Sequence, residues 1–309
     1  MSAVIEHPRT ILDTEKPFFP LDLGVRIPKI RDLYQLATIK QWDPRVDIDW
    51  AAFDISKYTE EQRYAGRQYW SRRAWSEYGA LAESPILQIR FCHDDCPPDL
   101  PLFFAIRTQE ESRHAEVCVR MAELLGGYME QPVQSGFQGS VATHGVRKMA
   151  LDPYMSIEAI LAALVCAAEE IAFDVFRHLV DITPDPVAKQ ICTHIMRDEV
   201  RHCAFGWRYL DYRIPQMSKQ EIQQVEDAVI SMMEKVELNG YHSPWLAPSN
   251  PASQAEMDVD RITWEAGLGA TVEELEKPIF VSTVQRIRRQ MEPWGVNLPI
   301  FSHPKIGKF

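Results

Sequence analysis

A Glu-x-x-His motif occurs twice in this chain of 309 residues, as Glu111-Ser-Arg-His114 and as Glu199-Val-Arg-His202. On an α-helix, residues at positions i and i+3 project from the same face, with Cβ atoms roughly 5–6 Å apart. A carboxylate and an imidazole placed in this way can bind one metal ion, or help to bridge two. The repeated motif therefore predicts two helices whose metal-binding faces meet inside the fold.

Long helical stretches carry both motifs. A capping box, Thr59-Glu-Glu-Gln62, opens the first stretch, and the Gly126-Gly127 pair is a predicted C-cap of the second. The four long helices are predicted to begin at caps, which are Thr59, Asp99, Ser156 and Asp185. The fourth helix is predicted to run to about residue 212, so the four-helix core covers residues 59–212.

Segments on either side of this core complete a single predicted domain over residues 1–309. Residues 1–58 form an N-terminal extension with one short helix over 30–41, and residues 128–152 form a long connection. Residues 213–309 are predicted to hold C-terminal helices and a tail, with caps at Ser218 and Thr271. No run alternates as strands do, so the fold class is all-α: a four-helix bundle with N- and C-terminal helical extensions.

Charge and hydropathy exclude several classes of protein. The net charge of −11 disfavours binding to the phosphates of nucleic acid. The longest apolar run, Ala159 to Ala168, is too short to span a bilayer, and the N-terminus shows no secretory signal. We therefore expect a cytoplasmic protein with no nucleic-acid partner and no membrane association.

The two motifs lie on the helix faces that should point into the bundle. An ionised glutamate there is costly to bury unless it binds a metal ion or another cation. A four-helix di-iron site takes one further glutamate from each of the other two helices. On the first helix we favour Glu77, which shares a stripe with Trp70 and Ala74, over Glu83, which adjoins Pro85.

On the third helix, Glu169 and Glu170 are adjacent rivals. Helical phase places Glu169 on the flank of the apolar face, near Val165 and Phe176. Glu170 falls on the side of Asp174, which we interpret as solvated. We favour Glu169 as the ligand and keep Glu170 as the alternative, because a π-bulge can shift helical phase by one residue.

Each motif is also preceded by an acid, Glu110 and Asp198. A metal-bound histidine usually donates its other ring N–H to a carboxylate outside the ligand set, which fixes its tautomer. We predict that Asp198 accepts from His114 and that Glu110 accepts from His202, across the bundle. The alternative is that both acids are surface charges.

At these residues the chain resembles the ferritin-like di-iron carboxylate oxygenase superfamily. Arg197-Asp-Glu-Val-Arg-His202 and Glu169-Glu-Ile-Ala-Phe173 look like the fourth- and third-helix motifs of the ribonucleotide reductase small subunit. The length and layout look closer to the p-aminobenzoate N-oxygenase family. The resemblance covers about residues 59–212 and implies a ferritin-like four-helix bundle.

Two departures from these families bear on activity. The reductase subunit has a radical-forming tyrosine one turn after the second-helix histidine, where this chain has Cys118. The N-oxygenases have an extra histidine ligand four residues before the fourth-helix glutamate, where this chain has Ile195. His194 is adjacent and stays a candidate extra ligand, although it points about 100° away on a helix. The first departure removes the reductase role, and the second is a difference from the ligand set of the N-oxygenases.

The resemblance implies a non-haem di-iron oxygenase with two iron ions as cofactor and O2 as co-substrate. It implies a small-molecule substrate and an external electron donor, a ferredoxin or a reductase, since no flavin or nicotinamide fingerprint is present. The reaction expected is amine N-oxygenation in secondary metabolism. The alternatives are a C–H hydroxylase or desaturase acting on a small or carrier-tethered substrate, and a non-enzymatic ferritin-like iron-binding protein. A homodimer stays open.

Overall fold

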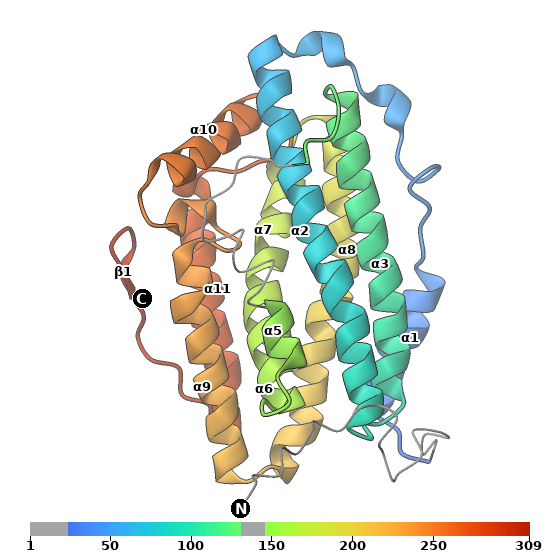
Figure 1. Ribbon diagram of the computed structural model, residues 1–309, viewed down its shortest axis with the longest axis vertical. Helices are drawn as coiled ribbons and strands as arrows, with labels where there is room; N and C mark the ends of the chain where they lie inside the picture. Colours follow the sequence, from blue (N-terminus) through green and yellow to red (C-terminus); the bar gives the residue numbers. More distant parts are fainter. Residues whose placement is uncertain (1–23, 131–145) are drawn as a thin grey trace, which may run out of the picture.

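The computed structural model describes residues 24–130 and 146–309, and within them the predicted four-helix bundle is the centre of the fold. Two of its members, α2 (Glu60–His93) and α3 (Asp99–Leu124), pack as an antiparallel pair. The other two are α8 (Pro186–Arg213) and a helix that runs from Ile157 to Ile182 in three parts. Figure 1 shows these long helices side by side along the long axis of the molecule.

The third helix of the bundle contains a π-helical segment. It consists of α6 (Ile157–Leu161), the π-helix η4 (Ala162–Glu169) and α7 (Glu170–Ile182). Seven of the eight residues of η4 are buried, and the exception is Glu169. π-helical turns are frequent at functional sites. Here the segment ends at the glutamate that we favour as a ligand.

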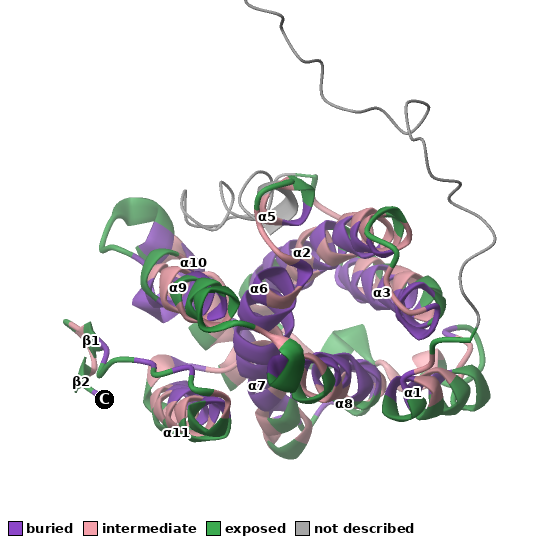
Figure 2. Ribbon diagram, turned by 90° about the horizontal axis from the view of Figure 1, so that it is seen from below, coloured by how far each residue is buried: buried purple, intermediate pink, exposed green. Residues whose placement is uncertain are grey.

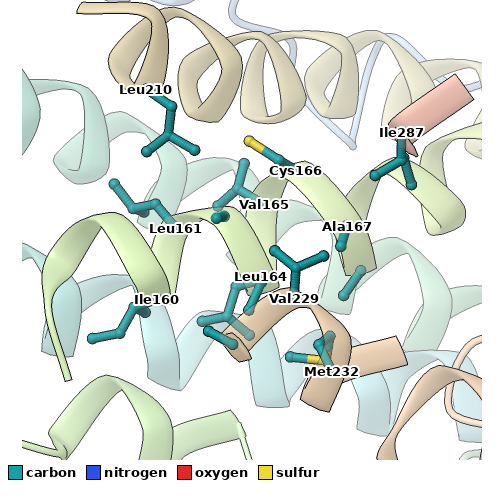
Figure 3. Close-up of a cluster of buried hydrophobic side chains, with 14 of the residues drawn as sticks. Ile160, Leu161, Leu164, Val165, Cys166, Ala167, Leu210, Val229, Met232 and Ile287 are labelled. Atoms are coloured by element: carbon teal, nitrogen blue, oxygen red, sulfur yellow. The ribbon is translucent and has the colours of Figure 1, made fainter. Parts of the chain in front are cut away.

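Small side chains allow close packing around η4. Figure 3 shows Leu164 of η4 beside Val229 of α9 (Lys219–Lys235), and Cys166 on the side of Leu210 of α8. A Cβ atom added at Gly206 of α8 would lie 2.8 Å from a methyl carbon of Val165. Glycine is therefore required at position 206, because the two helices approach one another too closely for a larger residue.

The predicted caps were mostly confirmed. Thr59 and Ser218 form capping boxes, and Ser156 and Asp185 accept hydrogen bonds from the first turns of their helices. The prediction for Asp99 was wrong. Asp99 is the first residue of α3, and its carboxylate instead accepts from the Ile27 backbone N–H at 2.7 Å.

The N-terminal extension lies along α3 and α8. Its helix α1 (Pro28–Ile39) confirms the helix predicted over 30–41, and two short 3₁₀ turns follow, η1 (Trp50–Ala52) and η2 (Ile55–Lys57). The first part of the extension and most of the connection predicted over 128–152 lie outside the described residues. The connection ends in a short helix that was not predicted, α5 (Val146–Leu151).

The C-terminal segment adds helices that pack against α7, η4 and α2 (Figure 2). After the 3₁₀ turn η5 (Ile214–Gln216) come α9, α10 (Pro251–Glu265) and α11 (Glu273–Met291). The remaining elements are short: η6 (Glu237–Asn239), η7 (Pro244–Leu246), η8 (Glu292–Trp294), β1 (Ser302–His303) and β2 (Gly307–Lys308). The third helix is thus covered on two sides, which explains its continuous apolar run.

Two predictions for this segment need correction. Helix α10 and the small antiparallel pair of β1 and β2 were not predicted. Thr271 does not cap α11, which begins after Val272, and the Thr271 hydroxyl has no hydrogen-bond partner within the described residues. Among the helices of residues 24–130 and 146–309, none is both long enough and apolar enough to cross a membrane.

Candidate metal centre

The glutamates and histidines of the two motifs meet in the interior of the bundle. His114 Nδ1 lies 3.4 Å from Glu111 Oε2 and 3.5 Å from Glu199 Oε1. His202 Nδ1 lies 3.1 Å from Glu199 Oε2 and 3.4 Å from Glu111 Oε1. Each histidine therefore faces both motif glutamates with the same ring nitrogen.

Two sets of ligand atoms result, each with all atoms within 4.8 Å of one another. The first set is Glu77, Glu111, His114 and Glu199, and the second is Glu169, Glu199 and His202. Glu199 belongs to both sets. This arrangement can hold two metal ions side by side, with a carboxylate between them.

Unpaired atoms at the centre of the cluster fit a metal-binding role. Glu111 Oε2, His114 Nδ1 and Glu169 Oε2 are buried, and none has a hydrogen-bond partner in the described part of the chain. Leaving such atoms unpaired costs about 1–3 kcal/mol each. A divalent cation would satisfy all three, and a mixed imidazole and carboxylate set suits iron or manganese.

The third-helix rivals point to different neighbours. Glu169 lies in the cluster, whereas Glu170 accepts from Trp207 Nε1 at 3.0 Å and from the Arg286 guanidinium of α11. The prediction that Glu170 and Asp174 lie on a solvated face was wrong. Both are buried, because α11 covers that face and Arg286 also pairs with Asp174.

The other candidate ligands separate in a similar way. Glu77 belongs to the first ligand set, whereas its rival Glu83 does not, although both line the same pocket. His194 lies outside both sets. Its ring stacks on Trp42 with centroids 4.5 Å apart, and its Nε2 lies 3.1 Å from the Asp47 carbonyl oxygen.

Two acids face the outer edges of the histidine rings. Asp198 Oδ2 lies 3.2 Å from His114 Nε2, and Glu110 Oε2 lies 2.9 Å from His202 Nε2. This is the cross-bundle pairing that the sequence predicts. With Nε2–H donated to these acids, Nδ1 of each ring presents its lone pair to the centre of the cluster.

Three further residues, which the sequence reasoning did not include, support these acids and ligands. Trp42 Nε1 donates to Asp198 at 2.9 Å, and Arg201 donates to Glu110 at 2.6 Å and also to Asp198. Arg107 donates to Glu169 and lies 2.9 Å from Glu111, in each case at Oε1. The Oε2 atoms of those two carboxylates are thereby left for a metal ion.

The pKa values of the two histidines reflect the excess of carboxylates in the cluster. Burial alone would lower the pKa of His202, but Glu199, Glu110 and Glu111 raise it to about 10. Burial would likewise lower the pKa of His114, which Asp198, Glu111 and Glu77 nevertheless raise well above its usual range. The potential that favours these imidazolium ions would equally favour a divalent cation.

Glu111 and Glu169 respond differently to burial. Burial alone would raise the pKa of Glu111, but the Arg107 guanidinium and the two histidines lower it to about 2. Burial raises the pKa of Glu169 to about 7, and Arg107 offsets only part of that effect. Of these two carboxylates, Glu169 is therefore the one in which burial outweighs the pairing with Arg107.

A pocket adjoins the cluster and encloses about 620 Å³, counting its open mouth. Four carboxylates of the cluster line one side, those of Glu77, Glu111, Glu169 and Glu199. Leu164, Ala168 and Phe176 line an apolar part, and Tyr241 and His242 complete the wall from the C-terminal segment. A small molecule could therefore lie directly against the candidate metal ligands.

If Asp198 fixes the tautomer of a metal-binding His114, then Asp198→Asn should weaken metal binding about 10- to 100-fold, the usual effect of losing such a partner. Competition with a chromophoric chelator would measure the affinity. The matched control is Asp211→Asn, which changes an acid on the same helix that instead accepts from Trp294 at the surface. Equal affinities for both variants would contradict the role of Asp198.

Comparison with known proteins places the fold. The sequence matches no protein-family model, and no curated protein resembles it significantly. The structure is similar to solved structures of a ferritin-like class of dimetal proteins. One is an R2-like ligand-binding oxidase with an aerobically reconstituted metal cofactor after photoconversion, with a TM-score of 0.67 and 13% identity over 84% of this chain and 92% of that chain.

A second structure of the R2-like ligand-binding oxidase, with an aerobically reconstituted Mn/Fe cofactor, matches equally well. Its TM-score is 0.66, again at 13% identity over 84% of this chain and 92% of the other. At this identity the likeness establishes a shared fold. The ferritin-like bundle expected from the sequence is confirmed, whereas a specific relation to the p-aminobenzoate N-oxygenases is not shown.

Proposed function

We propose that this chain is a non-haem dimetal oxygenase that uses O2 to oxidise a small molecule. The observation that carries this proposal is the pair of ligand sets that share Glu199 and open onto a pocket. Two bound iron ions, or one iron and one manganese, would supply the electrons and open coordination positions that O2 reduction requires. The similar R2-like oxidase has a Mn/Fe cofactor, which supports the choice of metals.

The roles of the chain's own residues follow from their positions. Glu77, Glu111 and His114 would bind one ion, Glu169 and His202 the other, and Glu199 would bind both. Asp198 and Glu110 hold the histidine tautomers, while Arg107 orients Glu169. Leu164 and Phe176 would contact the apolar part of a bound substrate, while the carboxylates of the cluster would face its reacting group.

We further propose that the substrate is an amine and that the reaction is N-oxygenation. The layout resembles the p-aminobenzoate N-oxygenases, and the aromatic rings of Phe176 and Tyr241 suit an aryl group beside the carboxylates. The similar structures are of an oxidase named as ligand-binding, which supports a small molecule in this pocket. Electrons would come from a ferredoxin or a reductase.

Turnover with isotopically labelled O2 tests this function. The metal-free protein would be loaded with Fe(II), or with Fe(II) and Mn(II), and supplied with a chemical reductant. A set of aromatic amines and matched substrates without an amino group would then be compared by mass spectrometry. We expect label on the amine nitrogen, and none with Glu199→Ala. Label on carbon alone would replace N-oxygenation by C–H hydroxylation, and no incorporation with any substrate would contradict an oxygenase.

A further inference from the structure

A histidine outside the candidate ligand sets reaches the pocket from the C-terminal segment. His242 lines the pocket beside the cluster together with Glu77 and Glu199, and it also lines a second hollow of about 500 Å³ next to it. The side chain of His242 is 19% exposed to solvent. His242 therefore lies between the candidate metal centre and this second hollow, which we call the outer hollow.

A buried carboxylate holds this histidine. His242 Nδ1 lies 3.0 Å from Glu237 Oε1 and 3.2 Å from Glu237 Oε2, and Glu237 is fully buried. A buried carboxylate needs such a partner, because desolvating an unpaired charge is costly. Donation of Nδ1–H to Glu237 leaves Nε2, on the opposite edge of the ring, as the nitrogen able to accept a proton.

The chain around the pair is tightly constrained. Gly240 has a φ of +95°, and a Cβ atom there would lie 2.7 Å from the Ala247 backbone nitrogen. Only glycine fits this turn, which directs the next two side chains towards the pocket. The Tyr241 ring packs on His242 with centroids 4.3 Å apart. The imidazole is thus held on one edge by a carboxylate and contacts a tilted aromatic ring.

The proposed reaction needs protons at this place. N-oxygenation of an amine follows RNH2 + O2 + 2e⁻ + 2H⁺ → RNHOH + H2O, in which one oxygen atom enters the N–H bond and the other leaves as water. The external donor supplies the two electrons. The two protons must reach the oxygen atom that becomes water, at the side of the pocket lined by the carboxylates of the cluster.

We propose that His242 transfers these protons from solvent to the pocket and that Glu237 positions it; this inference rests on the proposed function. Nε2 takes a proton from water in the outer hollow, while the Nδ1–H stays hydrogen-bonded to Glu237. The proton then passes to the leaving oxygen atom, which returns the ring to its neutral form, and the cycle runs twice per turnover. An Asp–His pair performs the same kind of transfer in hydrolases.

A third hollow adjoins the outer one. The outer hollow shares Pro244, Asp260 and Glu276 with a third one of about 690 Å³, formed between α10 and α11. Charged groups from the elements around His242 also line these spaces and the pocket. These groups are Arg72, Arg73, Glu77, Glu83, Arg107, Glu111, Glu169, Glu199, Asp260 and Glu276.

The experiment compares His242→Ala, Glu237→Gln and the wild type after loading with Fe(II), in the presence of an aromatic amine and a chemical reductant. O2 consumption is followed by an oxygen electrode, and metal content is measured for each. The control is His93→Ala, which removes a histidine from an exposed pair with Asp94 at 2.8 Å. We expect His242→Ala to keep its metal but consume O2 about 100-fold more slowly, in the range of lost acid–base catalysis. Added imidazole should restore the rate of His242→Ala, and not that of Glu237→Gln.

Nitrogen NMR of the wild type gives a second readout that needs no turnover. We expect His242 to carry its proton on Nδ1, and an Nε2-protonated ring would overturn the inference even if the variants fold poorly. It is also overturned if His242→Ala matches the wild type, or if imidazole fails to restore its rate. A wild-type chain that binds two metal ions but consumes no O2 would instead contradict the proposed function, and this inference with it.

Discussion

Replacing Glu199 by alanine is expected to abolish binding of both metal ions, whereas Glu77→Ala and Glu169→Ala should each leave one ion per chain. The reason is geometric. Glu199 belongs to both sets of ligand atoms, while Glu77 belongs only to the first and Glu169 only to the second. Metal analysis by mass spectrometry, after loading with Fe(II) or Mn(II) and removal of excess ions, would measure the stoichiometry.

Glu116→Ala is the matched control for these variants, because Glu116 lies on the exposed face of α3, two residues beyond His114. It should bind two ions, as the wild type does. Circular dichroism would establish that each variant is folded. Two ions retained by Glu199→Ala would refute the shared role of this carboxylate, and equal losses in all three cluster variants would refute the division into two sets.

The features predicted correctly from the sequence are those that depend on local geometry. A Glu-x-x-His spacing fixes which side chains share a helix face, whatever surrounds that helix. The capping boxes at Thr59 and Ser218 are equally local, and both were found. The four-helix bundle was predicted because two such motifs on inward faces need two further helices, each of which supplies another glutamate.

The features that were missed depend on contacts between distant parts of the chain. Trp42 reaches Asp198 across 156 positions of sequence, and no local pattern indicates that contact. Arg201, by contrast, lies three residues after Asp198, so its spacing offered a signal that was not used. Tyr241 and His242 enter the pocket from a segment whose turn depends on Gly240, in a region that reads only as rich in proline.

The position of Glu170 shows how tertiary packing overrides helical phase. Adjacent residues differ by about 100° around a helix, and the structure places Glu169 in the cluster and Glu170 outside it. Helical phase could not show what Glu170 faces. Helix α11, more than a hundred residues later, brings Arg286 to Glu170 and Asp174, so the face interpreted as solvated is an interface with a buried ion network.

That interface predicts opposite effects on metal binding and stability when Glu169 and Glu170 are each replaced by alanine. Glu170→Ala should leave metal binding unchanged and lower the free energy of unfolding of the metal-free protein by about 2–3 kcal/mol, because Trp207 Nε1 and Arg286 both lose an acceptor. This value is below the usual cost of breaking a buried pair, since Arg286 is partly exposed. Glu169→Ala should do the reverse, with loss of a metal ion and little change in stability.

Glu169 contributes little stability to the metal-free chain because its carboxylate lies unpaired at Oε2 among other acids, where burial raises its pKa to about 7. Its removal also leaves Arg107 paired with Glu111. Urea unfolding and metal analysis on the same preparations would test the contrast. If Glu170→Ala lost metal and Glu169→Ala kept it, the third-helix ligand would be Glu170, and the side chains at the end of the π-helix would have to exchange directions when the metal binds.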